Sequence, residues 1–139
     1  MDSTLYFMIA AILVFAVCML LLLFRIGHGS KDLNVEKYRR RWIEIERMVN
    51  KDDQQSCQFA VIEADKLLDI AMKERGIKGD TMGERLKTAK DSWSNRDAVW
   101  SAHKLRNQIV HEADVKVSYE TAKRALSGFK KALKDVGAI

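Results

Sequence analysis

The chain has 139 residues, of which 47% are hydrophobic and 31% are charged, with a formal net charge of +5, 7 glycines and no proline. This length leaves room for one domain, and the lack of proline argues against a β-sandwich, a collagen-like segment or a long disordered linker. Because Leu5 to Phe24 is an unbroken run of 20 apolar residues, the rest of the chain is only about 38% apolar, which suits one anchor and one small soluble helical domain.

The apolar run predicts a transmembrane anchor within residues 1–25. Twenty helical residues span about 30 Å, the thickness of the hydrocarbon core of a bilayer, and the run carries no charge. The residues before it hold Asp2 as their one charged side chain, whereas a cleavable signal peptide begins with a basic segment. We therefore expect a retained single span rather than a cleaved signal or a buried core helix.

The charges that follow the run predict its orientation. Residues 25–41 contain six cations and two acids, and Lys and Arg collect on the side of a membrane that is not translocated. We expect one span of the inner (cytoplasmic) membrane, with the N-terminus outside and residues 25–139 in the cytoplasm. A reducing cytoplasm makes a disulfide between Cys18 and Cys57 unexpected. The positive charge is compatible with binding anionic lipid headgroups or nucleic acid.

Residues 26–33 are expected to be a flexible tether, and residues 34–139 an all-α domain. Apolar spacing and capping residues predict helices over about 34–50, 54–75, 81–89, 94–112 and 118–136. Asn34, Thr81, Ser94 and Ser118 are the expected N-caps, and Gly76 is expected to end the second helix. The predicted fold is an N-terminal transmembrane helix followed by a four- to five-helix antiparallel bundle, whose small core residues favour close packing.

The helix predicted over residues 54–75 has the clearest apolar stripe. At 100° per residue, its apolar side chains fall within an arc of about 140°. They are Cys57, Ala60, Val61, Ala64, Leu67, Leu68, Ala71 and Met72. We expect this face to pack into the core.

The helix predicted over residues 94–112 breaks its own pattern. Its inward face comprises Val99, Ala102, Leu105, Ile109 and Val110. At 100° per residue, Arg106 falls in the middle of that face. A buried guanidinium requires an anionic partner because removing an unpaired charge from water is costly. Asp65 and Asp69 on the 54–75 helix are the candidate internal partners, and an incoming phosphate is the functional one.

Three polar residues follow the flank beside Arg106. His103, Asn107 and His111 are spaced by four residues and drift by about 40° per step, so they can form a polar strip. The histidines also fit ordinary, partly exposed side chains. Neither a carboxylate nor a third histidine completes a metal-ligand set at this spacing. We therefore predict no metal and no other cofactor.

The segment from Arg106 to His111 resembles the R-[N/D/H]-x-x-x-H motif of the HEPN superfamily, small all-α domains that carry it on a late helix, as here. In catalytic members the resemblance implies metal-independent RNA cleavage at a composite site formed by two protomers. It implies that His111 is the general acid or base and that Arg106 binds the scissile phosphate. It also implies that Asn107 orients the side chain of either His111 or Arg106. Other members act as RNA-binding, sensor or partner-binding modules.

Further candidate site residues and a second resemblance accompany this motif. His103, Asp65 and Asp69 are the expected supporting residues. The stretches 63–69, 82–87 and 102–107 resemble one-span membrane proteins of small-genome bacteria, and that resemblance implies no activity.

Three functions follow as alternatives. The first is a membrane-tethered homodimer that cleaves or binds RNA, because Arg106 and His111 point about 140° apart on one helix and one protomer could not easily aim both at one phosphate. The second is a non-catalytic interaction or scaffold module with a protein partner, in which Arg106 is a structural ion-pair residue. The third is an envelope scaffold that contacts lipid headgroups through residues 39–41.

Overall fold

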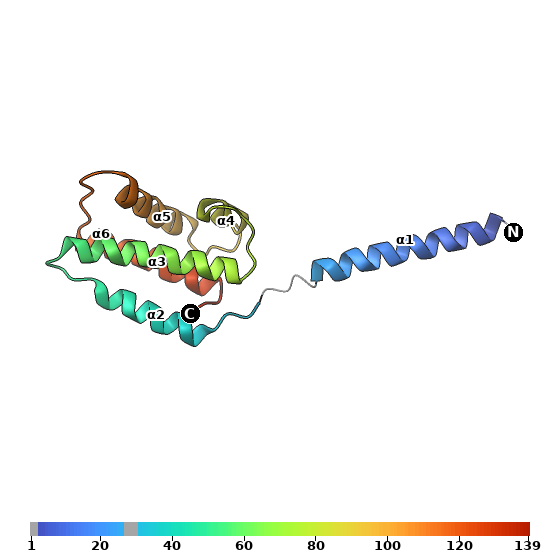
Figure 1. Cartoon of the computed structure of the whole chain (residues 1–139), viewed down its shortest axis with the longest axis horizontal. Helices are drawn as coiled ribbons and strands as arrows, with labels where there is room; N and C mark the ends of the chain where they lie inside the picture. The colour runs from blue at the N-terminus through green and yellow to red at the C-terminus, as the bar shows by residue number, and fades with distance from the viewer. Residues whose placement is uncertain (1–2, 27–30) are drawn as a thin grey trace. The chain divides into compact units, whose positions relative to one another are not determined.

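The computed structural model describes residues 3–26 and 31–139 (Figure 1). The helices are α1 (Ser3–Ile26), α2 (Val35–Met48), α3 (Gln54–Glu74), α4 (Met82–Thr88), α5 (Arg96–His111) and α6 (Tyr119–Asp135). Since no β-strand occurs in these two described ranges, the all-α prediction is confirmed. The chain divides into two compact units, residues 1–30 and 31–139.

Helix α1 belongs to the first unit. Residues Ser3–Leu23 are long and apolar enough to cross a membrane, and none of this stretch is buried within the protein. A helix that is apolar on every side suits a membrane span or a deeply buried core position, and here no protein core covers it. Half of the predicted tether, residues 27–30, lies outside the described residues.

The second unit is a domain with its own hydrophobic core. The core draws on α2 to α6 and runs from Leu33 to Ala138, and no described residue of α1 contributes to it. The compact unit begins at residue 31, and Leu33, within the predicted tether, packs inside its core. Removing α1 removes no core contact, and a unit of this size with one core can fold by itself.

Helix α3 is the centre of the domain. It packs against α2, α5 and α6, and Figure 1 places α2 and α5 on opposite sides of it. All eight apolar residues predicted for its inward stripe are buried. The predicted end is confirmed: Gly76 has a φ of +82°, a left-handed conformation that glycine adopts without strain. The Gly76 and Ile77 amides donate back to the Lys73 and Met72 carbonyls.

The predicted helix caps are confirmed with one exception. The side chains of Asn34, Thr81 and Ser118 accept backbone hydrogen bonds at the starts of α2, α4 and α6. Helix α5 is capped by Asn95 instead of Ser94. Ser94 was the wrong choice because its hydroxyl and amide both donate to Asp135 beside the end of α6, a tertiary contact that local capping patterns do not reveal.

Close helix packing is confirmed where α6 crosses α5. Gly128 of α6 is buried, and a Cβ built on it would lie 2.8 Å from the carbonyl oxygen of Ala98 on α5. A methyl group does not fit at that distance. The two backbones therefore meet directly, and glycine is required at this point for steric reasons.

We predict that Gly128→Ala lowers the free energy of unfolding of residues 31–139 by about 1–3 kcal/mol, because the added methyl group forces α5 and α6 apart. Gly83→Ala in α4 is the matched control: its Cβ would make only ordinary contacts at 3.9–4.0 Å, and alanine is the better helix former. Urea unfolding measures both. Equal stability of the two variants would contradict the proposed close contact.

Candidate functional site

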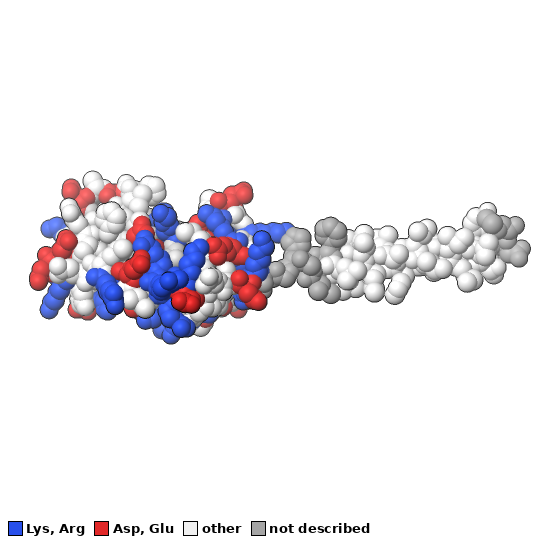
Figure 2. Space-filling model, turned by 60° about the horizontal axis from the view of Figure 1, so that its bottom comes forward, with Lys and Arg blue, Asp and Glu red and all other residues white. Residues whose placement is uncertain are grey.

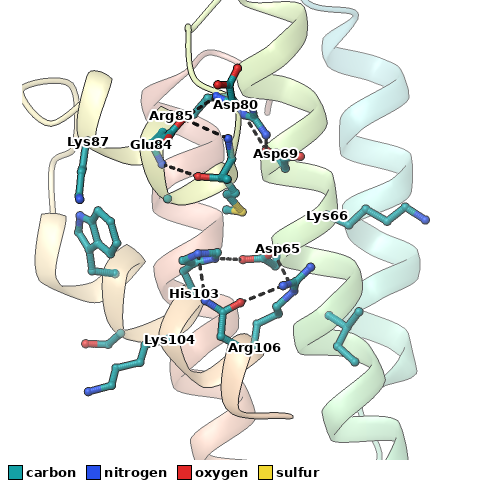
Figure 3. A pocket seen from close by; sticks show the side chains of 17 residues that line it. Asp65, Lys66, Asp69, Asp80, Glu84, Arg85, Lys87, His103, Lys104 and Arg106 are labelled. Carbon is teal, nitrogen blue, oxygen red and sulfur yellow. Dashed lines mark hydrogen bonds and ion pairs between the residues drawn. The ribbon is translucent and has the colours of Figure 1, made fainter. Parts of the chain in front are cut away.

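A cleft of about 980 Å³ opens between α3, α4 and α5 (Figure 3). Its polar wall combines side chains from all three helices. Among them are Asp65 and Asp69 of α3, Arg85 of α4, and His103, Arg106 and Asn107 of α5. Five of the six residues that the sequence singled out therefore lie in one cleft.

Asp65 is the centre of this wall and is only 2% exposed. One carboxylate oxygen lies 2.7 Å from His103 Nδ1, and the other lies 3.2 Å from Arg106 Nε. Arg106 Nη1 donates to Asn107 Oδ1 at 2.9 Å, and Asn107 Nδ2 lies 3.3 Å from His103 Nε2. Asp65, His103, Arg106 and Asn107 thus close a ring, the polar network, that joins α3 to α5.

The polar network selects one tautomer for a neutral His103. Because Asn107 Oδ1 accepts from Arg106, the amide nitrogen of Asn107 faces His103 Nε2 as a donor. His103 Nε2 is then the acceptor, and the ring proton lies on Nδ1, which donates to Asp65. These proton positions are assigned from the hydrogen bonds. A carboxylate therefore orients the imidazole, as in a general base, while Asn107 covers the other ring nitrogen.

Arg106 is half-buried, with 32% of its side chain exposed. Its Nε is buried and, although close to Asp65, makes no hydrogen bond. Asp65, rather than Asp69, is therefore the internal partner of this guanidinium. The exposed part of Arg106 keeps donors that an anion in the cleft can reach.

Arg85, which was not among the predicted site residues, forms a second ion pair in the cleft. Arg85 is 4% exposed, and its Nε and Nη2 donate to Asp69 Oδ1 at 2.8 and 2.6 Å. Lys73 also contacts Asp69, at 2.7 Å. The signal was present in the sequence: Arg85 interrupts an apolar stripe at helical spacing, as Arg106 does. The stripe is Met82, Leu86 and Ala89.

The second ion pair changes the acidity of Asp69. Burial by itself raises the pKa of this carboxyl group, but hydrogen bonds from Lys73 and Arg85 outweigh burial and hold the pKa below its ordinary value. Asp69 is therefore a structural carboxylate that neutralises Arg85, and it is already engaged by two cations.

His111 lies apart from the polar network. It is the last residue of α5, it is exposed, and it does not line the cleft. Val110, which the helical pattern placed on the inward face, is 50% exposed. This part of the prediction was wrong because Ile109 packs against the core in the last turn of α5, and Val110 lies 100° further around the helix. One chain thus joins Arg106, Asn107 and His103 but leaves His111 outside.

Trp100 and Gly83 shape the cleft beside His103. The Trp100 ring is half-buried and meets the imidazole edge to face, with centroids 6.2 Å apart. A Cβ built on Gly83 would lie 3.9 Å from His103 Nε2 and 4.0 Å from Trp100. The missing side chain at Gly83 therefore leaves room next to the imidazole.

Within the described ranges 3–26 and 31–139, no group of three or more His, Cys, Asp or Glu side chains is placed to hold a metal ion. Comparisons with protein-family models, curated proteins and solved structures find no match. The side chains of the cleft present an oriented imidazole, a partly exposed guanidinium and a neutralised ion pair.

We predict that Asp69→Asn lowers the free energy of unfolding of residues 31–139 by about 2–3 kcal/mol at neutral pH, because the buried Arg85 loses its carboxylate. The folded-state pKa of Asp69 is lowered, so its contribution is present above about pH 4 and is lost as the pH falls through that pKa.

Urea unfolding across this pH range measures the effect. The stability difference between the wild type and Asp69→Asn should shrink below about pH 4. Asp91→Asn, which alters an exposed aspartate, is the control. A difference that stays constant from neutral to acid pH would contradict the role of the Asp69 carboxylate.

Proposed function

We propose that the chain is a membrane-tethered, HEPN-like domain that acts on RNA as a homodimer. In this proposal α1 spans the inner (cytoplasmic) membrane once, with its N-terminus outside and residues 31–139 in the cytoplasm. The length and apolarity of α1 support the span. The excess of cations over acids in residues 25–41 supports the orientation.

The observation that carries the RNA proposal is the placement of Arg106 and His111 on α5. Arg106 is held against the cleft wall by Asp65 and Asn107 and is still partly exposed, so it suits a phosphate whose charge grows during the reaction. His111 is exposed at the end of the same helix and suits proton transfer. Because His111 lies outside the cleft, a second protomer is needed to bring its own His111 to Arg106.

The proposed reaction needs no metal. His111 accepts the proton of a ribose 2′-hydroxyl, and the 2′-oxygen attacks the phosphorus as the bond to the leaving oxygen breaks. His111 then gives the proton it accepted to the leaving oxygen, and Arg106 stabilises the charge on the phosphate oxygens. Asn107 keeps Arg106 in place through its 2.9 Å hydrogen bond. The products are a cyclic phosphate end and a free hydroxyl end.

We predict that residues 31–139 cleave RNA in the presence of a chelator, and that His111→Ala lowers the rate about 100-fold or more. Arg106→Lys, which retains the charge beside Asp65, should also lose activity because lysine cannot hold the phosphate with two parallel hydrogen bonds. Arg96→Lys, an exposed arginine on the same helix, is the matched control.

A mixing experiment tests the composite site. An equal mixture of His111→Ala and Arg106→Lys chains should recover about a quarter of the wild-type activity, because half of the dimers hold one intact site. Size-exclusion chromatography establishes that dimers form. A wild type that does not cleave RNA in chelator, or a dimeric mixture that stays inactive, would contradict the nuclease proposal.

A non-catalytic interaction module at the membrane is the second candidate, and the ion pair of Arg106 with Asp65 favours it. The guanidinium already has a carboxylate within 3.2 Å, so its position on the inward face needs no phosphate to account for it. In this alternative the polar network orients α5 on α3 and presents a fixed surface to a protein partner.

We predict for this alternative that Asp65→Asn and Arg106→Gln are coupled by about 1–3 kcal/mol in a double-mutant cycle of unfolding free energies. Arg106→Gln should at the same time leave RNA binding unchanged. A coupling near zero would exclude a structural ion pair as the reason for Arg106. A coupling in this range together with intact RNA cleavage by the wild type would favour the first proposal.

A further inference from the structure

A groove of about 530 Å³ lies between α2 and α3, and Figure 1 places α2 on the opposite side of α3 from α5. Lys37, Arg40 and Arg41 of α2 and Lys66 of α3 supply its cations. Leu67 and Ile70 of α3 supply apolar surface. The groove is thus cationic at its edge and apolar along α3.

The cations of this groove differ in whether they form ion pairs. Arg41 contacts both of the acids that line the groove, Glu44 and Glu63, so these three charges sum to −1 and the other three cations leave the groove with a net charge of +2. Arg40 and Lys66 are exposed and form no ion pair with any residue in the described ranges.

Lys37 has only a weak partner. It lies 3.8 Å from Glu74, and both side chains are largely exposed, so this pair contributes little. Lys37, Arg40 and Lys66 therefore remain available to an external anion. Figure 2, which brings the α2 side forward, shows Lys and Arg gathered near the middle of that side with acids among them.

Apolar surface beside these cations indicates the chemistry of the anion. Ile70 is 38% exposed and lies next to the cations of the groove. This arrangement matches a phospholipid, whose phosphate lies above its apolar chains. Single-stranded RNA fits less well because it needs exposed aromatic faces for stacking. Tyr38, the aromatic residue that lines the groove, is 1% exposed.

The chain also limits the distance between this groove and a membrane that α1 would span. Residues 27–34 separate α1 from α2, and eight residues extend at most about 28 Å. A tether of this length gives an effective concentration on the order of millimolar, so even a weak affinity for headgroups is sufficient.

We propose that the groove between α2 and α3 docks on the anionic phospholipid headgroups of the membrane in which α1 is anchored. Arg40 and Lys66 contact lipid phosphates, and Ile70 contacts the adjoining apolar layer. This inference rests on the proposed membrane attachment but not on any action on RNA. It is tested on residues 31–139, which have their own core, so its failure is distinguishable from a failure of α1 to span a membrane.

The experiment is co-sedimentation of residues 31–139 with vesicles of pure phosphatidylcholine and of an equal mixture of phosphatidylcholine and phosphatidylglycerol. We expect binding to the anionic vesicles alone, weakened by added salt. Arg40→Gln combined with Lys66→Gln should weaken binding about fivefold per cation removed. Arg124→Gln combined with Lys131→Gln, which removes the same two charges from exposed positions on α6, is the matched control.

Three outcomes would overturn the proposal. One is no difference between the two kinds of vesicle. A second is an equal loss of binding in both double variants, which would indicate net charge alone. The third is binding of single-stranded RNA, in place of anionic vesicles, that depends on Arg40 and Lys66. Circular dichroism of both double variants shows whether the fold is retained, as expected for exposed positions.

Discussion

The carboxylate of Asp65 is the interaction on which the candidate site depends. It is almost fully buried on α3, a position that is costly for a charge unless partners from another helix compensate it. His103 and Arg106 of α5 supply that compensation. Because an apolar pair of similar volume often gives equal or greater stability, the value of this arrangement lies in orientation. It fixes the imidazole tautomer and holds the guanidinium at the cleft wall.

Helix α3 connects two surfaces of different chemistry. Toward α4 and α5 it presents Asp65 and Asp69, whose charges organise arginines from both helices. Toward α2 it presents Ile70 and an exposed lysine, Lys66, which borders both the cleft and the groove.

Much of the fold could be predicted from the sequence because its signals are local. Helical periodicity identified every buried apolar residue of the α3 stripe, and Gly76 marked the end of that helix. Predictions failed where a distant contact intervened. Ser94 contacts Asp135 instead of capping α5. Val110 is exposed because the core contacts α5 through Ile109, which lies 100° away around the helix.

The amino-acid order by itself determined the apolar first helix, the helical character of the domain and the need of Arg106 for an anion, since each depends on neighbours within a few turns. Only the tertiary structure decided which carboxylate pairs with Arg106. Asp65 and Asp69 lie one turn apart on α3, and periodicity treats them alike. Because α4 packs beside Asp69, Asp69 pairs with Arg85. Because α5 packs beside Asp65, Asp65 contacts Arg106 and His103. Partner choice of this kind depends on how helices align in space, which spacing along one helix does not encode.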